Sequence, residues 1–348
     1  MKRLPLFDEV VSVERQHPIY RLLSSGDFGA EREVLLSWSE GFEDRDGKFC
    51  KEFQSSFESC LWELYVYAYL KEIGVSVDFS YSSPDFVVNG SDPFCLEATI
   101  ASPADGRPRP YGYSLEDLPD DLNRFNAEAT IRICNSFTSK VRRLRDYYTT
   151  LPQCKDKPFV LAIASIDRPF SHLAAMRPIL SALYGLYHDE ELTLALGAQK
   201  VISYTVDRVK KNETARIDLG YFCNAEYKDV SAVIFSNLAT WGKVRALSDN
   251  PEALTFFHTF HPGHGLYPIQ KTASKADYYE HLIDGLYVFH NPFAECKLGH
   301  HVLGHERLAQ VFVNSEGELV TELPDDFLLV RSLMSINLTD NNQEADEG

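Results

Sequence analysis

Apolar residues recur at helical spacing in one stretch of the chain, and a strand-like alternation follows it. In residues 57–74 the apolar positions include Phe57, Leu61 and Leu64, among neighbours that favour helix formation. This spacing predicts an amphipathic helix. Gly74 is a suitable left-handed stop after the last turn of that helix.

The residues after this helix alternate between apolar and polar types. Residues 75–79 have the period of a half-buried strand, and a second strand is expected to begin at Phe86. Asn89-Gly90 is a hairpin turn signal. The segment 94–101 should therefore return antiparallel to the second strand.

A long polar loop separates these strands from the next helix. Residues 102–126 are rich in proline, glycine and charge, and a helix is predicted at 127–148. A loop of this length next to a site often contacts the substrate. A helix at 171–187 should be bent or interrupted at Pro178. Three further apolar runs predict strands of the same sheet, at residues 158–165, 230–237 and 285–292.

Two carboxylates fall where the predicted hairpin would bring them together. Asp85 precedes the second strand, and Glu97 lies inside the third strand between apolar neighbours. A lone buried charge is costly, so Glu97 needs a partner. Neighbouring carboxylates repel, and each titrates high unless a cation lies between them. Mg²⁺ binds one or two carboxylates and leaves room for phosphate oxygens, which points to phosphoryl chemistry.

The order of helix, glycine stop, strand, Pro84-Asp85, strand and Glu97 resembles the helix–PD–(D/E)xK signature of the restriction-endonuclease-like nucleases. The resemblance covers residues 50–170. It implies an α/β fold with an αβββαβ core, a mixed central sheet, and helical and loop elaborations. It also implies a Mg²⁺- or Mn²⁺-dependent endonuclease that acts on nucleic acid, with DNA favoured, in a restriction or phage-defence setting.

The same resemblance implies a set of metal ligands. The spacing to the glycine stop favours Glu63 over Glu58 as the helical glutamate of the signature. Glu63, Asp85 and Glu97 would then hold the metal ion and carry the catalytic chemistry.

The sequence departs from the family pattern at the motif lysine. Thr99 stands two residues after Glu97, where the lysine is expected. Members of the family sometimes supply this lysine from a neighbouring helix, and Lys140 is the best substitute in this chain. Arg142 and Arg143 follow on the same predicted helix and would contact phosphates.

Each of these residues also has a structural interpretation without chemistry. Glu63 would be the solvent-facing side of an amphipathic helix, and Asp85 would cap its own turn. Lys140 would belong to a solvated basic face. In that case the chain would be a catalytically degenerate binding or regulatory module, because Thr99 cannot replace the charge of a lysine.

Composition limits the remaining classes of protein. The 348 residues are 44% hydrophobic and 12% aromatic, so a packed core is easily built. Seven cysteines without a CxxC pair predict neither a disulfide framework nor a zinc site. No signal peptide and no apolar run of about 20 residues is present, which predicts a cytoplasmic protein without a membrane partner. The net charge of −17 disfavours tight nonspecific binding to DNA, so a locally basic groove would be needed.

A histidine cluster offers a different chemistry. His258, His261 and His264 could hold zinc or nickel, and a histidine-dependent metalloenzyme unrelated to nucleic acid is therefore an alternative. Pro262-Gly263 would break a helix that aligned the three imidazoles, so solvated loop histidines are favoured. Neither a phosphate-binding glycine loop nor a GxSxG elbow occurs.

The chain is expected to form one main domain with additions at both ends. The expected units are an entry segment at 1–48 that ends in an acidic turn at 43–47, the nuclease-like α/β domain at 49–310, a C-terminal extension at 311–339, and an acidic tail of disordered composition at 340–348. A homodimer or a partner protein is also expected, because cleavage of two strands needs two active sites.

Overall fold

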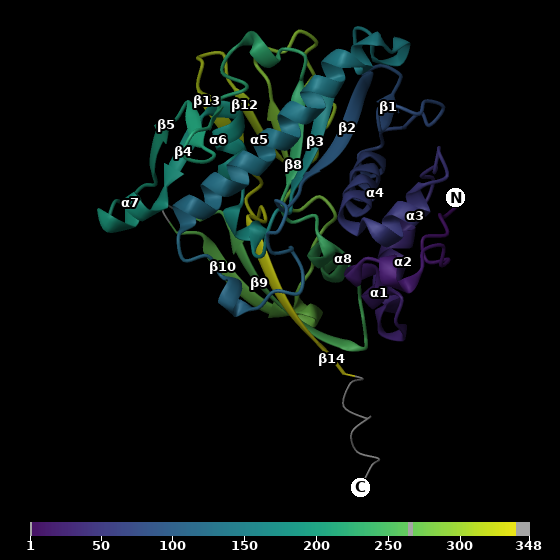
Figure 1. Cartoon of the computed structure of the whole chain (residues 1–348). Helices are drawn as coiled ribbons and strands as arrows, with labels where there is room; N and C mark the ends of the chain where they lie inside the picture. Colours follow the sequence, from purple (N-terminus) through teal and green to yellow (C-terminus); the bar gives the residue numbers. More distant parts are fainter. Residues whose placement is uncertain (1, 264–266, 339–348) are drawn as a thin grey trace.

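A seven-stranded mixed sheet forms the centre of the molecule, whose computed structural model describes residues 2–263 and 267–338 (Figure 1). The spatial order of its strands is β1-β2-β3-β8-β11-β12-β13. The strands are β1 (Phe86–Val88), β2 (Phe94–Ala101), β3 (Phe159–Ser165), β8 (Ala232–Ser236), β11 (Tyr287–His290), β12 (Ala309–Val313) and β13 (Leu319–Glu322). Strands β2, β3 and β8 run parallel to one another, and β1 pairs antiparallel with β2.

Helices cover both faces of this sheet. The helices of the described residues are α1 (Pro18–Leu23), α2 (Gly29–Trp38), α3 (Phe49–Ser55), α4 (Phe57–Glu72), α5 (Leu122–Asp146), α6 (Arg177–Tyr184), α7 (Glu190–Ala195) and α8 (Trp241–Leu247). Helices α1 to α4 pack on one face, and α5 and α6 pack on the other (Figure 1). The expected mixed α/β fold is therefore confirmed.

The sheet separates two hydrophobic cores because successive side chains of a strand point to opposite faces. Leu96 and Val160 belong to the core on the α4 side. Cys95 and Leu161 belong to the core on the α5 side. All seven residues of β3 are buried, as expected for a parallel strand that is covered on both faces.

Helix α4 has the predicted boundaries, and Gly74 adopts the left-handed φ of +76° expected after its end. The prediction of an amphipathic helix was wrong, because 11 of its 16 residues are buried. The reason is an additional layer, formed by the N-terminal segment with α1, α2 and α3, that packs over the side of α4 facing away from the sheet.

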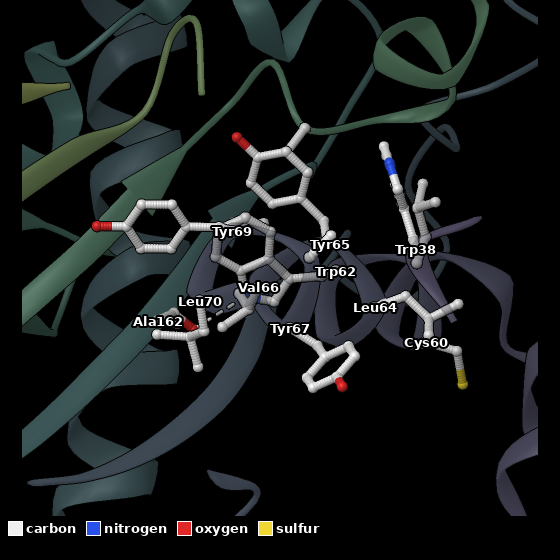
Figure 2. Close-up of a cluster of buried hydrophobic side chains, with 14 of the residues drawn as sticks. Trp38, Cys60, Trp62, Leu64, Tyr65, Val66, Tyr67, Tyr69, Leu70 and Ala162 are labelled. Atoms are coloured by element: carbon white, nitrogen blue, oxygen red, sulfur yellow. Dashed lines mark hydrogen bonds between the residues drawn. The ribbon is translucent and has the colours of Figure 1, made fainter. Parts of the chain in front are cut away.

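Large aromatic residues fix α4 between these layers (Figure 2). The Nε1 of Trp62 donates a hydrogen bond to the carbonyl oxygen of Ala162 in β3, at 3.0 Å. The hydroxyl of Tyr65 donates to the carbonyl oxygen of Leu282 at 2.8 Å. The Trp38 ring of α2 packs edge-on against Tyr65 with a centroid distance of 5.6 Å. The helix is thus tied to the sheet and to the N-terminal layer at once.

The predicted hairpin is present, but the elements around it differ from the expectation. The strand predicted at 75–79 is reduced to one isolated bridge between Val77 and Val88. Residues 89–93 connect β1 to β2, a longer connection than the two-residue turn that Asn89-Gly90 suggested. Gly90 has a φ of +110°, so the glycine still provides the change of direction.

Two helices begin at other positions than predicted. Helix α5 starts at Leu122, because Asp121 caps it by accepting a hydrogen bond from the Arg124 amide at 2.7 Å. The inserted loop therefore spans 102–121. Pro178 lies in the first turn of α6, where proline is well tolerated, so it begins this helix and does not bend it.

The polar region around 188–228 forms small peripheral elements. These are α7 and two hairpins, β4 (Leu186–Asp189) with β5 (Ile202–Thr205) and β6 (Arg208–Lys210) with β7 (Arg216–Asp218). A separate antiparallel sheet has the order β10-β9-β14 and is built from β9 (Ala253–His261), β10 (Ile269–Ser274) and β14 (Val330–Asn337).

The ends of the chain belong partly to the main body. Leu6 and Leu35 of the segment 1–48 are fully buried in the core around α4. Strand β12 spans the expected boundary at residue 310. The acidic tail predicted at 340–348 lies outside the described residues. No helix in the described ranges is long and apolar enough to cross a membrane, and all seven cysteines are free thiols.

Candidate active site

The β1–β2 hairpin places Asp85 and Glu97 opposite each other. The register pairs Phe86 with Leu96, so Asp85, one residue before β1, continues this pairing with Glu97. The Oδ2 atom of Asp85 accepts a hydrogen bond from the amide of Ala98 at 2.7 Å, which fixes the carboxylate against β2. The predicted proximity of these two acidic residues is therefore present.

Glu97 is buried, and its partner is the lysine that the sequence suggested. Its side chain is 3% exposed, and its Oε1 lies 2.7 Å from the Nζ of Lys140 in α5. The Oε2 atom is buried without a hydrogen-bond partner among the described residues. Thr99 lies two residues further along the same strand on the same face and is half-buried. Lys140 thus supplies, from the neighbouring helix, the positive charge that Thr99 lacks.

Glu63 contributes a third acidic group from α4. Burial raises the pKa of Glu63 well above its ordinary value, and the charges of Asp85 and then Glu97 raise it further. Burial also raises the pKa of Asp85 to about 7, with the Glu97 charge as the next cause. The three carboxylates therefore act on one another electrostatically, although they come from a helix and two strand segments.

Basic residues of α5 border this acidic group. Arg142 and Arg143 are exposed, and the Nη1 of Arg143 lies 4.0 Å from the Oε1 of Glu97. Arg145 is engaged elsewhere, because its Nε pairs with Asp229 at 2.8 Å. Of the two expected phosphate-contacting residues, the structure thus brings Arg143 beside the carboxylates, whereas Arg142 is exposed on the same helix with no contact to them.

Sequence reasoning missed Arg45, which lies in the segment predicted as an acidic turn. Its Nη1 donates to the carbonyl oxygens of Tyr81 and Pro84 at 2.8 and 3.1 Å. Its charge lowers the pKa of both Asp85 and Glu63, against the larger raising effect of burial. The sequence shows only an arginine inside an acidic stretch, and this pattern does not indicate that Arg45 contacts Tyr81 and Pro84, which lie far along the chain.

Arg45→Gln is expected to raise the pKa of Asp85 further, so that the pH profile of Asp85 protonation, followed by NMR titration of its carboxyl group, shifts to higher pH. The reason is that Asp85 loses a nearby positive charge and the segment before it loses two hydrogen bonds. Arg32→Gln is a matched control, because Arg32 also donates to two backbone carbonyls, those of Leu23 and Ser25. A profile that moves equally in both variants would contradict this role.

The raised pKa of Asp85 predicts a stability that falls as pH rises. The unfolded chain releases this proton near pH 4, whereas the folded protein holds it up to about pH 7. The folded state therefore binds more protons between these values, and the free energy of unfolding should decrease by about 2 kcal/mol across this window. Urea unfolding at about pH 4.5 and about pH 7.5, near the two ends of this window, should reveal the decrease in the wild type.

Asp85→Asn should reduce this pH dependence, because the amide does not titrate, whereas the buried Glu63 keeps its own contribution of the same sign. Asp146→Asn, at an exposed aspartate at the end of α5, serves as the control and should leave it unchanged. An Asp85→Asn protein with the wild-type pH dependence would contradict the assignment.

The carboxylates do not by themselves form a complete metal cage. Within residues 2–263 and 267–338, no group of three or more histidine, cysteine or acidic side chains is arranged to hold a metal ion. Mg²⁺ needs fewer protein ligands, since it commonly binds one or two carboxylates and keeps its waters. The unpartnered Oε2 of Glu97 and the raised pKa of Asp85 fit such a two-carboxylate site.

The histidine cluster has a different environment from the predicted loop. His258 and His261 lie in strand β9, and His264 lies outside the described residues. The Nδ1 of His258 is 2.9 Å from the hydroxyl of Thr272, and the Nδ1 of His261 is 2.9 Å from the carbonyl oxygen of Asp326. The loop assignment was wrong for these two histidines, because the antiparallel pairing of β9 with β10 extends to His261.

Comparison of the chain with protein-family models, with curated proteins and with solved structures finds no match. The geometry of the site therefore carries the functional argument alone.

Proposed function

We propose that this protein is a metal-dependent phosphodiesterase, an endonuclease that acts on nucleic acid, with DNA favoured over RNA. The observation that carries the proposal is the meeting of Asp85 and Glu97 across one antiparallel strand pair, with Lys140 bonded to Glu97. Two carboxylates can hold a divalent cation, and a lysine beside them can stabilise developing negative charge, and metal-assisted phosphodiester hydrolysis can use both contributions.

The order of elements supports a restriction-endonuclease-like core as part of the proposal. Helix α4 is followed by the bridge at Val77, then by β1, β2, α5 and β3. This is the αβββαβ order, with the first strand reduced to a single bridge. The parallel pairing of β2 with β3 across α5 agrees with it, because parallel neighbours need such a crossover.

Each residue has a distinct role in the proposed site. Asp85 and Glu97 would hold Mg²⁺ or Mn²⁺, and Glu63 would contribute a third negative charge. The bound ion would polarise the phosphoryl group and lower the pKa of a bound water. Lys140 would orient the attacking water or stabilise the developing negative charge. Arg142 and Arg143 would contact neighbouring phosphates.

A second candidate function is a binding or regulatory module that keeps the fold without catalysis. The observation in its favour is the 2.7 Å ion pair between Lys140 and Glu97, which neutralises the carboxylate that a metal would need. Thr99 at the motif position agrees with this alternative.

The test is cleavage of supercoiled plasmid, single-stranded DNA and single-stranded RNA by the full-length protein with Mg²⁺ or Mn²⁺, and with EDTA as the metal-free control. Thermal unfolding with and without Mg²⁺ is measured in parallel. We expect cleavage that EDTA abolishes. A metal-induced rise in melting temperature without cleavage would favour the binding module. The absence of both effects in a folded protein would contradict the proposal.

The metal-induced stabilisation should itself depend on pH. Mg²⁺ competes with the proton on Asp85, so the rise in melting temperature should be larger at about pH 8 than at about pH 5.5. It should also disappear in Asp85→Asn at both pH values, whereas Asp146→Asn should keep it. An equal rise in wild type and Asp85→Asn would place the ion elsewhere.

A further inference from the structure

A cavity lies at the carboxyl ends of the parallel strands, away from the acidic group. Its volume is about 520 Å³, within the range that holds small organic ligands. Its wall is formed by residues of α1, of the start of α4 with Glu58, of the segment 110–113 in the inserted loop, of the connection after β3, of α8 with the residue before it, and of β14. None of Glu63, Asp85, Glu97 or Lys140 lines it. Crevices beyond the carboxyl ends of parallel strands are common ligand sites in α/β proteins.

Among the described residues, two arginines of the cavity wall have buried nitrogen atoms without hydrogen-bond partners. Arg331 is 4% exposed, and its Nε is buried without a partner, whereas its Nη1 pairs with Glu280. Glu280 also pairs with Lys243, so one carboxylate serves two cations. Arg245 has two buried nitrogens, Nε and Nη2, without partners in the described part of the chain. Both side chains line the cavity, so their positive charges can attract an anion bound there.

The two arginines approach the same short helix. Arg245 belongs to α8, and its guanidinium lies 5.9 Å from the ring centroid of Trp241 in the first turn of that helix. The Nη2 of Arg331 lies so close to Gly242 that a Cβ atom there would be 2.9 Å from it. The guanidinium groups of Arg245 and Arg331 therefore lie beside the same wall of the cavity, with Glu280 paired to Arg331 and the charge of Glu31 acting on Arg245.

Aromatic rings form another part of the wall. Tyr113 of the inserted loop and Phe170 pack against each other with a centroid distance of 4.7 Å, and Trp241 lines the same cavity. His172 is also in the wall, where burial and the Arg331 charge lower its pKa to about 4, so it is neutral near pH 7. Aromatic faces of this kind stack well on planar rings, nucleobases included.

We propose that this cavity binds a nucleoside phosphate, with the phosphate near Arg245 and Arg331 and the base among Tyr113, Phe170 and Trp241. A free mononucleotide and the phosphorylated end of a nucleic-acid strand share this chemistry. The proposal concerns a site that is separate from the carboxylates, and it stands whether or not those carboxylates cleave phosphodiesters.

Tryptophan fluorescence provides the test, because Trp241 lines the cavity whereas Trp38 and Trp62 are buried in the core. The full-length protein is titrated in EDTA with the 5′-monophosphates of adenosine, guanosine, cytidine and uridine. Adenosine, inorganic phosphate and a 5′-phosphorylated oligonucleotide are the comparison ligands. We expect saturable quenching by at least one monophosphate, with adenosine and inorganic phosphate each binding at least about tenfold more weakly. Binding of the phosphorylated oligonucleotide alone would assign the site to a strand end.

Two variants and a control connect this binding to the proposed residues. Arg245→Met removes unpaired donors and should keep the melting temperature, but it should raise the dissociation constant about tenfold. Tyr113→Leu, at a side chain in the exposed loop, should weaken the nucleotide about fivefold without changing the affinity for inorganic phosphate. Arg208→Met, at an exposed arginine of β6, should change nothing. No saturable quenching by any probe, or unchanged affinity in folded Arg245→Met, would overturn the proposal.

Discussion

Glu97→Gln should reduce metal-dependent cleavage by about 10²–10³-fold or more and leave the protein folded. The amide keeps the shape of the side chain but removes the charge that would hold the ion. Glu97 is the only one of the three acidic residues that is both fully inside a strand and bonded to Lys140. The loss should therefore be visible in the rate of cleavage at saturating metal, measured on the substrate that the wild type cuts fastest.

Glu31→Gln is the matched control for this variant. Glu31, in α2, is also a buried glutamate and is 1% exposed. Its carboxylate accepts hydrogen bonds from the side chain of Asn250, and this contact lies away from the acidic group. It should keep wild-type cleavage, even if its stability changes. Cleavage that persists undiminished in folded Glu97→Gln would reject the proposed active site.

Lys140→Met should lower the free energy of unfolding by about 3 kcal/mol, the largest effect on stability expected for this site. The substitution removes the hydrogen bond that Oε1 of Glu97 accepts, while Oε2 already lacks a partner, and it leaves Arg143, 4.0 Å away, as the remaining cationic neighbour. A buried charge that has lost its hydrogen-bonded partner is far more costly than a lost surface contact. Urea unfolding at about pH 7.5 measures this change in the free energy of unfolding.

The double variant Lys140→Met/Glu97→Gln should recover most of that loss, since it removes the stranded charge as well. Lys228→Met is the control, because Lys228 forms an ion pair with Glu295 in which both side chains are exposed, and its loss should cost less than about 1 kcal/mol. If Lys140→Met leaves both stability and cleavage unchanged, Lys140 is neither the substitute lysine nor the partner that Glu97 needs.

The elements that could be predicted are those whose pattern is local. The boundaries of α4 follow from apolar spacing and the glycine stop, and the β1–β2 hairpin follows from two short strands beside Asn89-Gly90. The buried strand β3 was evident as a continuous apolar run. In the site, the proximity of Asp85 and Glu97 was a consequence of the hairpin, so it could be predicted before the structure was known.

The remaining features depend on contacts between distant segments. Arg45 reaches the carbonyl oxygen of Pro84, and nothing in the local sequence encodes that contact. The burial of α4 on its outer side depends on the N-terminal layer, whose own helices are too short to show a clear period. The cavity is likewise assembled from six separate segments, and its arginines have no shared motif. The metal dependence, the nucleic-acid substrate and any homodimer stay predictions.

The enclosure of α4 between the sheet and the N-terminal layer has a consequence for dynamics. A helix that contacts protein on nearly every side cannot open locally, so its amide protons should exchange with solvent only through global unfolding. Glu63 is carried by this helix, and Asp85 lies just before β1, whose three residues are all buried. The backbone segments that carry Glu63 and Asp85 are therefore both held inside the core, and their amide protons should exchange together at the rate of global unfolding.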